Sequence, residues 1–375
     1  MLTQIVAHCR AGFEAETARD LTQIAAAADA TIDPIVTRDS ALVTARIRDA
    51  PSPTFGQWSG AIARRPPIFA RSIAFGSGPE QLFDRAATGR PDRLTPLVAS
   101  IERLADHAPF CALWLEYPDT NDGKSLSTLA HRLDARLKAA LREKAWLIER
   151  PRGTRLHVIW VDGATAYVGV SDSAWGSPWP AGIPRLKLPR DAPSRSTLKL
   201  GEAIAVFLGP HETELLRAGM RAVDLGAAPG GWTWQLAHRG LRVDAVDNGP
   251  LKGNVALDPR VRHIRADGFT FRPRTSVDWL VCDIVEQPIR VARLVADWVA
   301  GGLAARAIFN LKLPMKKRYE EVSRCRRAIE EILDRARTHL GLRFKQLYHD
   351  REEVTGYLAP DDGTSRRIGI RRPPR

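Results

Sequence analysis

The chain has 375 residues and a formal net charge of +13, which favours a polyanionic partner such as nucleic acid. Its four cysteines are too widely spaced for a zinc motif and its nine histidines are scattered, so we expect reduced thiols and no metal site. No apolar run approaches the ~20 residues that span a bilayer, and nothing at the N-terminus resembles a signal peptide, so we expect a cytoplasmic monomer without membrane association.

The first half of the chain alternates predicted strands and helices, which indicates an α/β fold. We expect one small α/β unit over residues 1–45 and a second over 46–170, followed by a linker over 171–198 that is rich in proline, glycine and serine. Trp175 and Trp179 lie in this linker and are interpreted as packing residues, with stacking on RNA as the alternative. Strands are predicted at 4–9, 110–116, 156–161 and 166–170, and helices at 13–28 and 125–141.

The most informative segment is a glycine-rich turn after an apolar strand, Val223-Asp224-Leu225-Gly226-Ala227-Ala228-Pro229-Gly230-Gly231-Trp232. Gly226, Gly230 and Gly231 can adopt positive φ and expose bare backbone to a ligand, and the helix predicted over 232–239 offers unpaired N–H groups. The turn lacks the lysine of a phosphate-binding loop and the second glycine of the dinucleotide fingerprint. It therefore favours a cofactor without phosphates, such as S-adenosylmethionine, over a merely structural turn.

Acidic residues follow this turn at the spacing of a cofactor pocket. The strand predicted over 241–247 ends in Asp247, about 20 residues beyond the glycines, where a carboxylate can hold a ribose diol. A short strand at 261–264 leads to Asp267, which is placed to meet the exocyclic amine of adenine. Both acids also belong to turn sequences, Asp-Asn-Gly-Pro and Asp-Gly, so a structural role is the alternative.

Two further apolar strands end in charged side chains. The strand predicted over 277–283 ends in Asp283, and the strand over 305–312 ends in Lys312. Ligands of open α/β sheets bind at the carboxyl ends of the strands. Burial there would lower the pKa of Lys312 and allow it to act as a base. A structural cluster of ion pairs is the alternative interpretation.

At these positions the chain resembles the FtsJ-like ribose 2′-O-methyltransferases. The glycine-rich turn is similar to that family's cofactor loop, and the similarity is dense over residues 182–355. More narrowly, the chain resembles the enzymes that methylate the ribose of a cytidine in bacterial 23S rRNA. Four residues are similar to the family's Lys-Asp-Lys-Glu tetrad, namely Lys199, Asp283, Lys312 and Glu353. The narrower similarity lies at 194–199, 309–321 and 347–355, and more thinly at 9–14, 69–71 and 119–121.

The resemblance implies a domain organisation and a cofactor pocket. A Rossmann-like methyltransferase domain would occupy residues 199–358, after a ferredoxin-like unit and a THUMP-type RNA-binding domain in the first half. Residues 359–375 would form a basic tail. The S-adenosylmethionine pocket would comprise Ser196, Ala228, Pro229, Gly230, Gly231, Asp247, Asp267 and Asp283.

The resemblance also implies a role for each tetrad residue. Lys312 would accept the proton of the ribose 2′-hydroxyl, with its pKa lowered by burial and by the nearby cation Lys199. Asp283 would orient Lys312, while Lys199 and Glu353 would position the ribose. The register of the Glu-Val pair favours Glu353 over Glu352 as the fourth member.

Two other classes of function are weighed against this one. A non-catalytic RNA-binding or ribosome assembly factor could retain the cofactor pocket, but it would have no reason to keep Lys312 at a buried strand end. A base or DNA methyltransferase would need a motif such as Asn-Pro-Pro-Tyr or Pro-Cys, and neither follows Asp283. The basic segment 316–318 lies beside the expected crevice, which favours contact with RNA phosphates.

Overall fold

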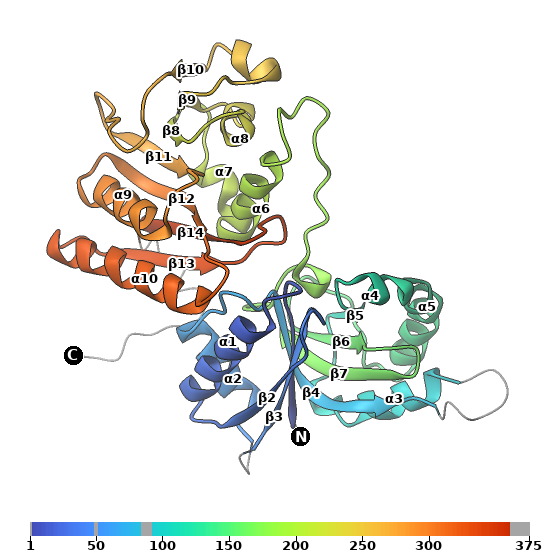
Figure 1. Ribbon diagram of the computed structural model, residues 1–375. Helices are drawn as coiled ribbons and strands as arrows, with labels where there is room; N and C mark the ends of the chain where they lie inside the picture. Colours follow the sequence, from blue (N-terminus) through green and yellow to red (C-terminus); the bar gives the residue numbers. More distant parts are fainter. Residues whose placement is uncertain (1, 49–51, 84–91, 361–375) are drawn as a thin grey trace. The chain divides into compact units, whose positions relative to one another are not determined.

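The computed structural model describes residues 2–48, 52–83 and 92–360. The described residues form two compact units that divide between Ile183 and Pro184, and each unit contains one seven-stranded sheet (Figure 1). The α/β fold class is therefore confirmed. Of the basic tail predicted over 359–375, residues 361–375 lie outside the described part of the chain.

The sheet of the first unit is mostly antiparallel, with strand order β2-β3-β1-β4-β7-β6-β5. Its helices pack on one face, where Trp58, Phe75 and Trp160 are fully buried in a common core. The strands are β1 (Gln4–His8), β2 (Ile32–Val36), β3 (Leu42–Ile47), β4 (Ser72–Gln81), β5 (Ala112–Glu116), β6 (Thr154–Trp160) and β7 (Thr165–Asp172). The helices are α1 (Glu14–Ala27), α2 (Phe55–Arg64), α3 (Leu94–Glu102), α4 (Asn121–Ser125) and α5 (Ser127–Glu143), with 3₁₀ turns η1 (Ala105–His107) and η2 (Pro180–Gly182).

Strand β4 joins the two N-terminal units that the sequence separates near residue 45. It pairs antiparallel with β1 on one side, where Ile5 faces Phe75, and with β7 on the other, where Phe75 faces Val170. No strand is predicted at this position, so the connection is not expected from the sequence. Both predicted units thus belong to one continuous sheet.

Trp175 packs rather than projecting into solvent, as predicted. Its Nε1 donates a hydrogen bond to Ser59 Oγ at 2.9 Å, and its ring lies against Phe55 and Phe75. These contacts attach the start of the predicted linker to the first unit. Between Asp172 and the helix that begins at Thr197, the chain contains only η2.

The second unit has a Rossmann-like sheet with strand order β10-β9-β8-β11-β12-β14-β13. Strands β8 to β12 run parallel, β14 pairs antiparallel with β12, and the edge strand β13 pairs antiparallel with β14, so that it runs in the same direction as β8 to β12. Helices α6 and α8 cover one face, and α9 and α10 cover the other (Figure 1). The strands are β8 (Arg221–Leu225), β9 (Arg242–Val246), β10 (Val261–Ile264), β11 (Val277–Cys282), β12 (Ala304–Lys312), β13 (Leu340–Lys345) and β14 (Glu353–Pro360). The helices are α6 (Thr197–Phe207), α7 (Glu212–Leu215), α8 (Gly231–His238), α9 (Pro288–Ala300) and α10 (Arg318–Arg335), with η3 (Gly209–His211) and η4 (Gly253–Leu257).

The strand order of the second unit fixes where a ligand can bind. From β8 the chain proceeds outward to β9 and β10, and then returns to place β11 and β12 on the other side of β8. The order therefore reverses between β8 and β11. In open α/β sheets the crevice for ligands lies at this switch point, beyond the carboxyl ends of the strands.

Substitution of Gly76 tests the close approach of β4 and β7. A Cβ on Gly76 would lie 1.9 Å from the carbonyl oxygen of Val168, which is backbone and cannot move aside. We expect Gly76→Ala to lower the free energy of unfolding by roughly 3 kcal/mol in urea titrations. Gly163→Ala is the control, because a Cβ there meets nothing within 4 Å. Equal stability of the two variants would contradict this account.

Candidate active site

The four tetrad residues meet at the carboxyl end of the second sheet, although they come from four different elements. Lys199 lies in the first turn of α6, Asp283 directly follows β11, Lys312 ends β12 and Glu353 begins β14. The antiparallel register of β12 and β14 pairs Lys312 directly with Glu353. Sheet topology, rather than proximity in the sequence, thus assembles the cluster.

Positive and negative groups alternate within this cluster. The Lys312 ammonium contacts Asp283 Oδ1, and it lies 3.0 Å from Glu353 Oε1. The Lys199 ammonium donates to Glu353 Oε2 at 2.5 Å and lies 3.8 Å from Asp283 Oδ2. Each cation therefore faces both carboxylates, and the formal charges of the four side chains cancel.

The predicted direction of the Lys312 pKa is wrong. Burial by itself does lower the pKa of this lysine, but the charges of Asp283 and Glu353 and their hydrogen bonds raise it by more, so the net pKa lies above the ordinary 10.5. Burial likewise raises the pKa of Glu353, whereas Lys312 and Lys199 lower it by more, and the net pKa lies below 4.5. At neutral pH Lys312 is therefore protonated and Glu353 is ionised.

A cavity of about 740 Å³ adjoins the cluster and is bounded by the glycine-rich turn. Of the residues predicted to bind the cofactor, Ser196, Ala228, Pro229 and Asp283 line it, together with the other three tetrad residues, Lys199, Lys312 and Glu353. Gly230 and Gly231 lie beside it, at the start of α8. A Cβ on Gly231 would lie 2.2 Å from Ser196 Oγ, so a glycine is needed for the two segments to meet.

Asp247 and Asp267 both make hydrogen bonds to backbone and are not among the residues that line this cavity. Asp247 Oδ2 accepts the Ala228 N–H at 3.0 Å, which holds the glycine-rich turn against the end of β9. Asp267 is exposed, and its Oδ1 accepts the Phe269 N–H at 2.8 Å. Contact of either carboxylate with a cofactor stays a prediction.

Glu352 and Glu353 have different surroundings. Glu352 is exposed and accepts a hydrogen bond from Arg318 Nη2 at 2.7 Å, outside the cluster. The structure therefore places Glu353, and not Glu352, with the other three tetrad residues. In the basic segment 316–318, Lys316 and Lys317 are exposed, whereas Arg318 is half-buried in this ion pair.

Sequence reasoning assigns no role to two buried acids near the cavity. Asp224, inside β8, accepts a hydrogen bond from Thr233 Oγ1 at 2.6 Å, and burial raises its pKa to about 7. Glu202 accepts the N–H groups of Tyr348 and His349 at 2.7 and 2.8 Å, which ties α6 to the loop before Glu353. A lone acid within an apolar strand is the signal that could have identified Asp224.

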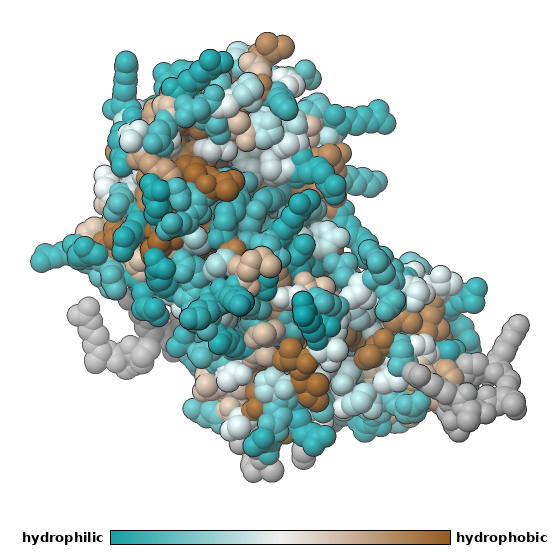
Figure 2. Space-filling view, viewed as in Figure 1, coloured by the Kyte–Doolittle hydropathy of each residue, from teal (hydrophilic) through white to brown (hydrophobic). Residues whose placement is uncertain are grey.

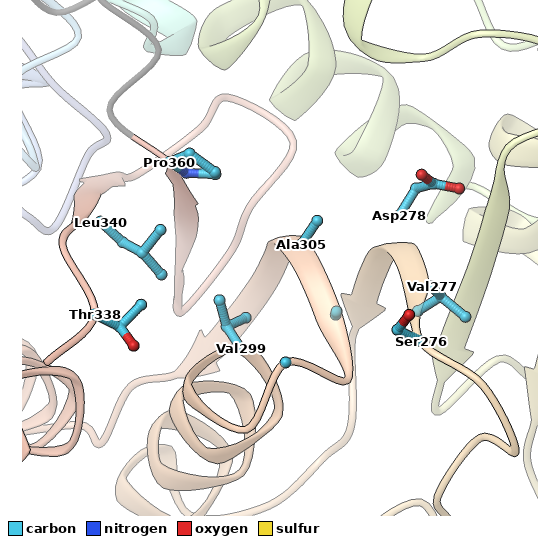
Figure 3. Close-up of a pocket in the computed structure, with 10 residues that line it drawn as sticks. Ser276, Val277, Asp278, Val299, Ala305, Thr338, Leu340 and Pro360 are labelled. Carbon is cyan, nitrogen blue, oxygen red and sulfur yellow. The ribbon is translucent and has the colours of Figure 1, made fainter. Parts of the chain in front are cut away.

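A second cavity, of about 420 Å³, lies at the opposite end of the same strands (Figure 3). It is lined mainly by small and apolar residues at the starts of β11 and β12. Asp278 lies at its border, and its carboxylate accepts the backbone N–H of Arg221 at 2.8 Å. Catalytic groups do not converge there.

The described residues contain no group of three or more histidines, cysteines and acids that could hold a metal ion. All four cysteines are buried and unbonded to one another. Within the same part of the chain, no helix is both long enough and apolar enough to cross a membrane.

Comparison with known proteins identifies relatives for both units. Residues 192–327 match the family model of FtsJ-like methyltransferases, and residues 92–172 match that of the N-terminal region of ribosomal RNA large subunit methyltransferase M. The protein of that name from Laribacter hongkongensis is 50% identical over 302 residues, which cover 80% of this chain and 85% of the relative. Its counterpart from Aromatoleum aromaticum is 46% identical over 358 residues, or 95% of this chain and 94% of the relative.

The substitution Asp224→Asn tests the raised pKa of Asp224, because that pKa makes the free energy of unfolding depend on pH. Because the folded-state pKa of about 7 exceeds the ordinary 3.8, folding favours the protonated form, and the wild type loses stability as the pH rises from 3.8 to about 7. Asp224→Asn lacks this titration. In urea unfolding we expect its stability relative to wild type to increase by at most ~4 kcal/mol from acid to alkaline pH.

Thr233→Val provides the matched variant. The hydrogen bond from Thr233 lowers the pKa of Asp224, so its loss should move the stability transition to higher pH. A difference between Asp224→Asn and wild type that does not change with pH would contradict the raised pKa.

Proposed function

The chain belongs to the family of ribosomal RNA large subunit methyltransferase M, and we propose that it methylates the ribose 2′-hydroxyl of a cytidine in 23S rRNA. It is an S-adenosylmethionine-dependent methyltransferase. The observation that carries the specific reaction is the Lys-Asp-Lys-Glu cluster beside the cavity of the glycine-rich turn. A 2′-hydroxyl must lose a proton as it attacks, and the cluster offers groups that can receive it.

The cavity suits S-adenosylmethionine on the basis of its own residues. Gly226 borders it with φ of +79°, and a Cβ there would approach Ile284 to 2.9 Å, so the wall beside β8 is bare backbone. The turn and Ser196 would hold the cofactor, with Asp247 at its ribose and Asp267 at its adenine. Bound there, the cofactor supplies a methyl group that is already activated by its sulfonium charge.

Lys312 is proposed as the proton acceptor, and its raised pKa sets a condition on that role. It must lose a proton before it can take one, which requires weaker attraction by Asp283 and Glu353 in the loaded site. Any cationic group that approaches Asp283 would lower the pKa of Lys312, because a nearby like charge disfavours the ammonium form of the lysine. Lys199 and Glu353 would position the ribose.

The first unit is proposed to bind the RNA substrate. We assign a ferredoxin-like unit to residues 1–45, a THUMP-type RNA-binding domain to 46–170, a linker to 171–198 and the methyltransferase domain to 199–358. The net charge of +13 supports a polyanionic substrate. Hydrophilic side chains are interspersed with neutral and hydrophobic ones on the surface displayed in Figure 2. We further propose that the protein acts as a cytoplasmic monomer.

Gly226→Ala tests the cofactor site. The new methyl group would lie 2.9 Å from Ile284 Cγ1 and 3.0 Å from its backbone nitrogen, so the cavity wall must shift. We expect the dissociation constant for S-adenosylmethionine, measured by calorimetry, to rise about tenfold or more. Gly219→Ala is the control, because its φ of +86° imposes a similar backbone strain while its Cβ meets nothing within 4 Å. Equal cofactor affinities would remove the cofactor from this turn.

Lys312→Ala and Lys312→Arg test the proton acceptor. Loss of a positioned base should lower turnover roughly 10²-fold or more. Arginine retains the positive charge but cannot give up its proton, so it should not restore turnover. Because the pKa of Lys312 is raised, the wild-type rate should continue to increase with pH through the alkaline range.

The measurement combines kinetics with mass mapping of ribose methylation in 23S rRNA. RNA from cells that lack the gene should lose one methylated cytidine, and wild-type protein, but not either variant, should restore it. Near-native turnover of Lys312→Arg would reduce Lys312 to a charge-positioning group. Native turnover of both variants would show that Lys312 is not the proton acceptor, whereas absence of methyl transfer by the wild-type protein would favour the non-catalytic assembly factor.

A further inference from the structure

The side chain of Asn310 connects the two carboxylates of the cluster. It lies on β12, two residues before Lys312 and therefore on the same face of the strand, and it is fully buried. Its Nδ2 donates to Glu353 Oε2 at 3.0 Å and to Asp283 Oδ1 at 3.3 Å. We propose that Asn310 is a positioning residue that holds both carboxylates in place during methyl transfer, an inference that rests on the proposed function of the cluster.

A hydrogen bond to the oxygen of the Asn310 amide fixes the orientation of that amide. Thr355, its register partner on β14, donates from Oγ1 to Asn310 Oδ1 at 2.7 Å. A flipped amide would turn its oxygen toward two carboxylates and its hydrogens toward the Thr355 hydroxyl. The observed arrangement uses both amide hydrogens and the amide oxygen, which removes the cost of burying this polar group.

A hydrogen-bond donor that does not titrate keeps its contacts at this position when Lys312 changes charge. Lys312 holds the carboxylates of Asp283 and Glu353 only while it is an ammonium, and a base must become neutral before it accepts the proton. At that moment one of the two cations that separate the carboxylates is lost. The amide of Asn310 does not titrate, so its two hydrogen bonds persist and keep the carboxylates aligned around Lys312.

Other residue types would not meet this requirement. Aspartate would add a third negative charge to the cluster, and leucine would leave both carboxylates with one hydrogen-bond donor fewer. Further titratable groups near the cluster are Lys199, which contacts Glu353, and Asp224 and Cys282, which interact electrostatically with Asp283. Asp350 joins through Thr355, because its Oδ2 lies 2.9 Å from Thr355 Oγ1. Burial raises the pKa of Asp350 to about 7, so this side of the network carries little negative charge below neutral pH.

Asn310→Leu is the principal test, with single-turnover rates measured against pH at saturating cofactor and RNA. We expect the rate to fall at least tenfold. The loss of rate that follows protonation of Glu353 should also begin at a higher pH, because the hydrogen bond from Asn310 favours the ionised form of Glu353. The dissociation constant for the cofactor should change much less than the rate. Thr17→Val, which removes an equally buried hydroxyl from the first unit, should leave the pH profile unchanged.

Thr355→Val keeps the proposal testable if Asn310→Leu does not fold. It retains the amide but releases its oxygen, so it should lower the rate in the same direction by a smaller factor. A native rate and a native pH profile in whichever variant folds would overturn the proposal.

A crystal structure of the Asn310→Leu or Thr355→Val variant gives a readout that does not depend on activity. Displaced carboxylates of Asp283 and Glu353 would support the positioning role, and undisturbed carboxylates would overturn it. Failure of the proposed function is recognised separately, because the wild-type protein would then methylate no ribose 2′-hydroxyl, and failure of Lys312 as the base would leave Lys312→Ala with the wild-type rate whatever happens at Asn310.

Discussion

Compensation of charge among Lys199, Asp283, Lys312 and Glu353 is the constraint on which the rest of the second unit depends. Two ammonium groups and two carboxylates share a half-buried site, where any one of them alone would be strongly disfavoured. The four groups come from α6 and from the ends of three strands, so all four segments must pack correctly before the charges cancel. Glu202 supports this by tying α6 to the loop that leads to Glu353.

The sequence predicts the positions of these groups better than their protonation. Asp283 and Lys312 follow from the rule that parallel strands present their carboxyl ends at one edge. The direction of the Lys312 pKa is not predicted correctly, because the expectation counts burial and the cation Lys199 but not the charges of Asp283, which follows β11, and Glu353, which begins an antiparallel strand 41 residues after Lys312. A strand pattern reports that a side chain is buried, but it does not report what charge faces it.

In the first unit, the sequence predicts some of the strands and helices but not the strand that connects them. The helices predicted at 13–28 and 125–141 and the strands predicted at 4–9, 110–116, 156–161 and 166–170 follow from local patterns, whereas α2, α3, α4, β2, β3 and β4 are not predicted. The second half of β4 is polar and begins with Gly76, so it lacks the alternation of apolar and polar side chains that predicts a strand. Because Gly76 has no side chain, its backbone can approach the backbone of Val168. The close approach of the β4 and β7 backbones therefore connects the two predicted units. A pattern of side chains does not predict such an approach.

The role of Asn310 could not be predicted from the sequence either. Asn310 is visible as a polar residue within an apolar strand, but its role depends on the side chains that the fold places around it. An amide is costly to bury unless all its polar atoms are paired, and here the partners are Asp283 after β11 and Glu353 and Thr355 on β14. Acids and bases change charge as they work, so the geometry of a cluster built only from them changes with protonation. A site that must keep its geometry while one lysine becomes neutral therefore needs a donor that does not titrate, and Asn310 is placed to be that donor.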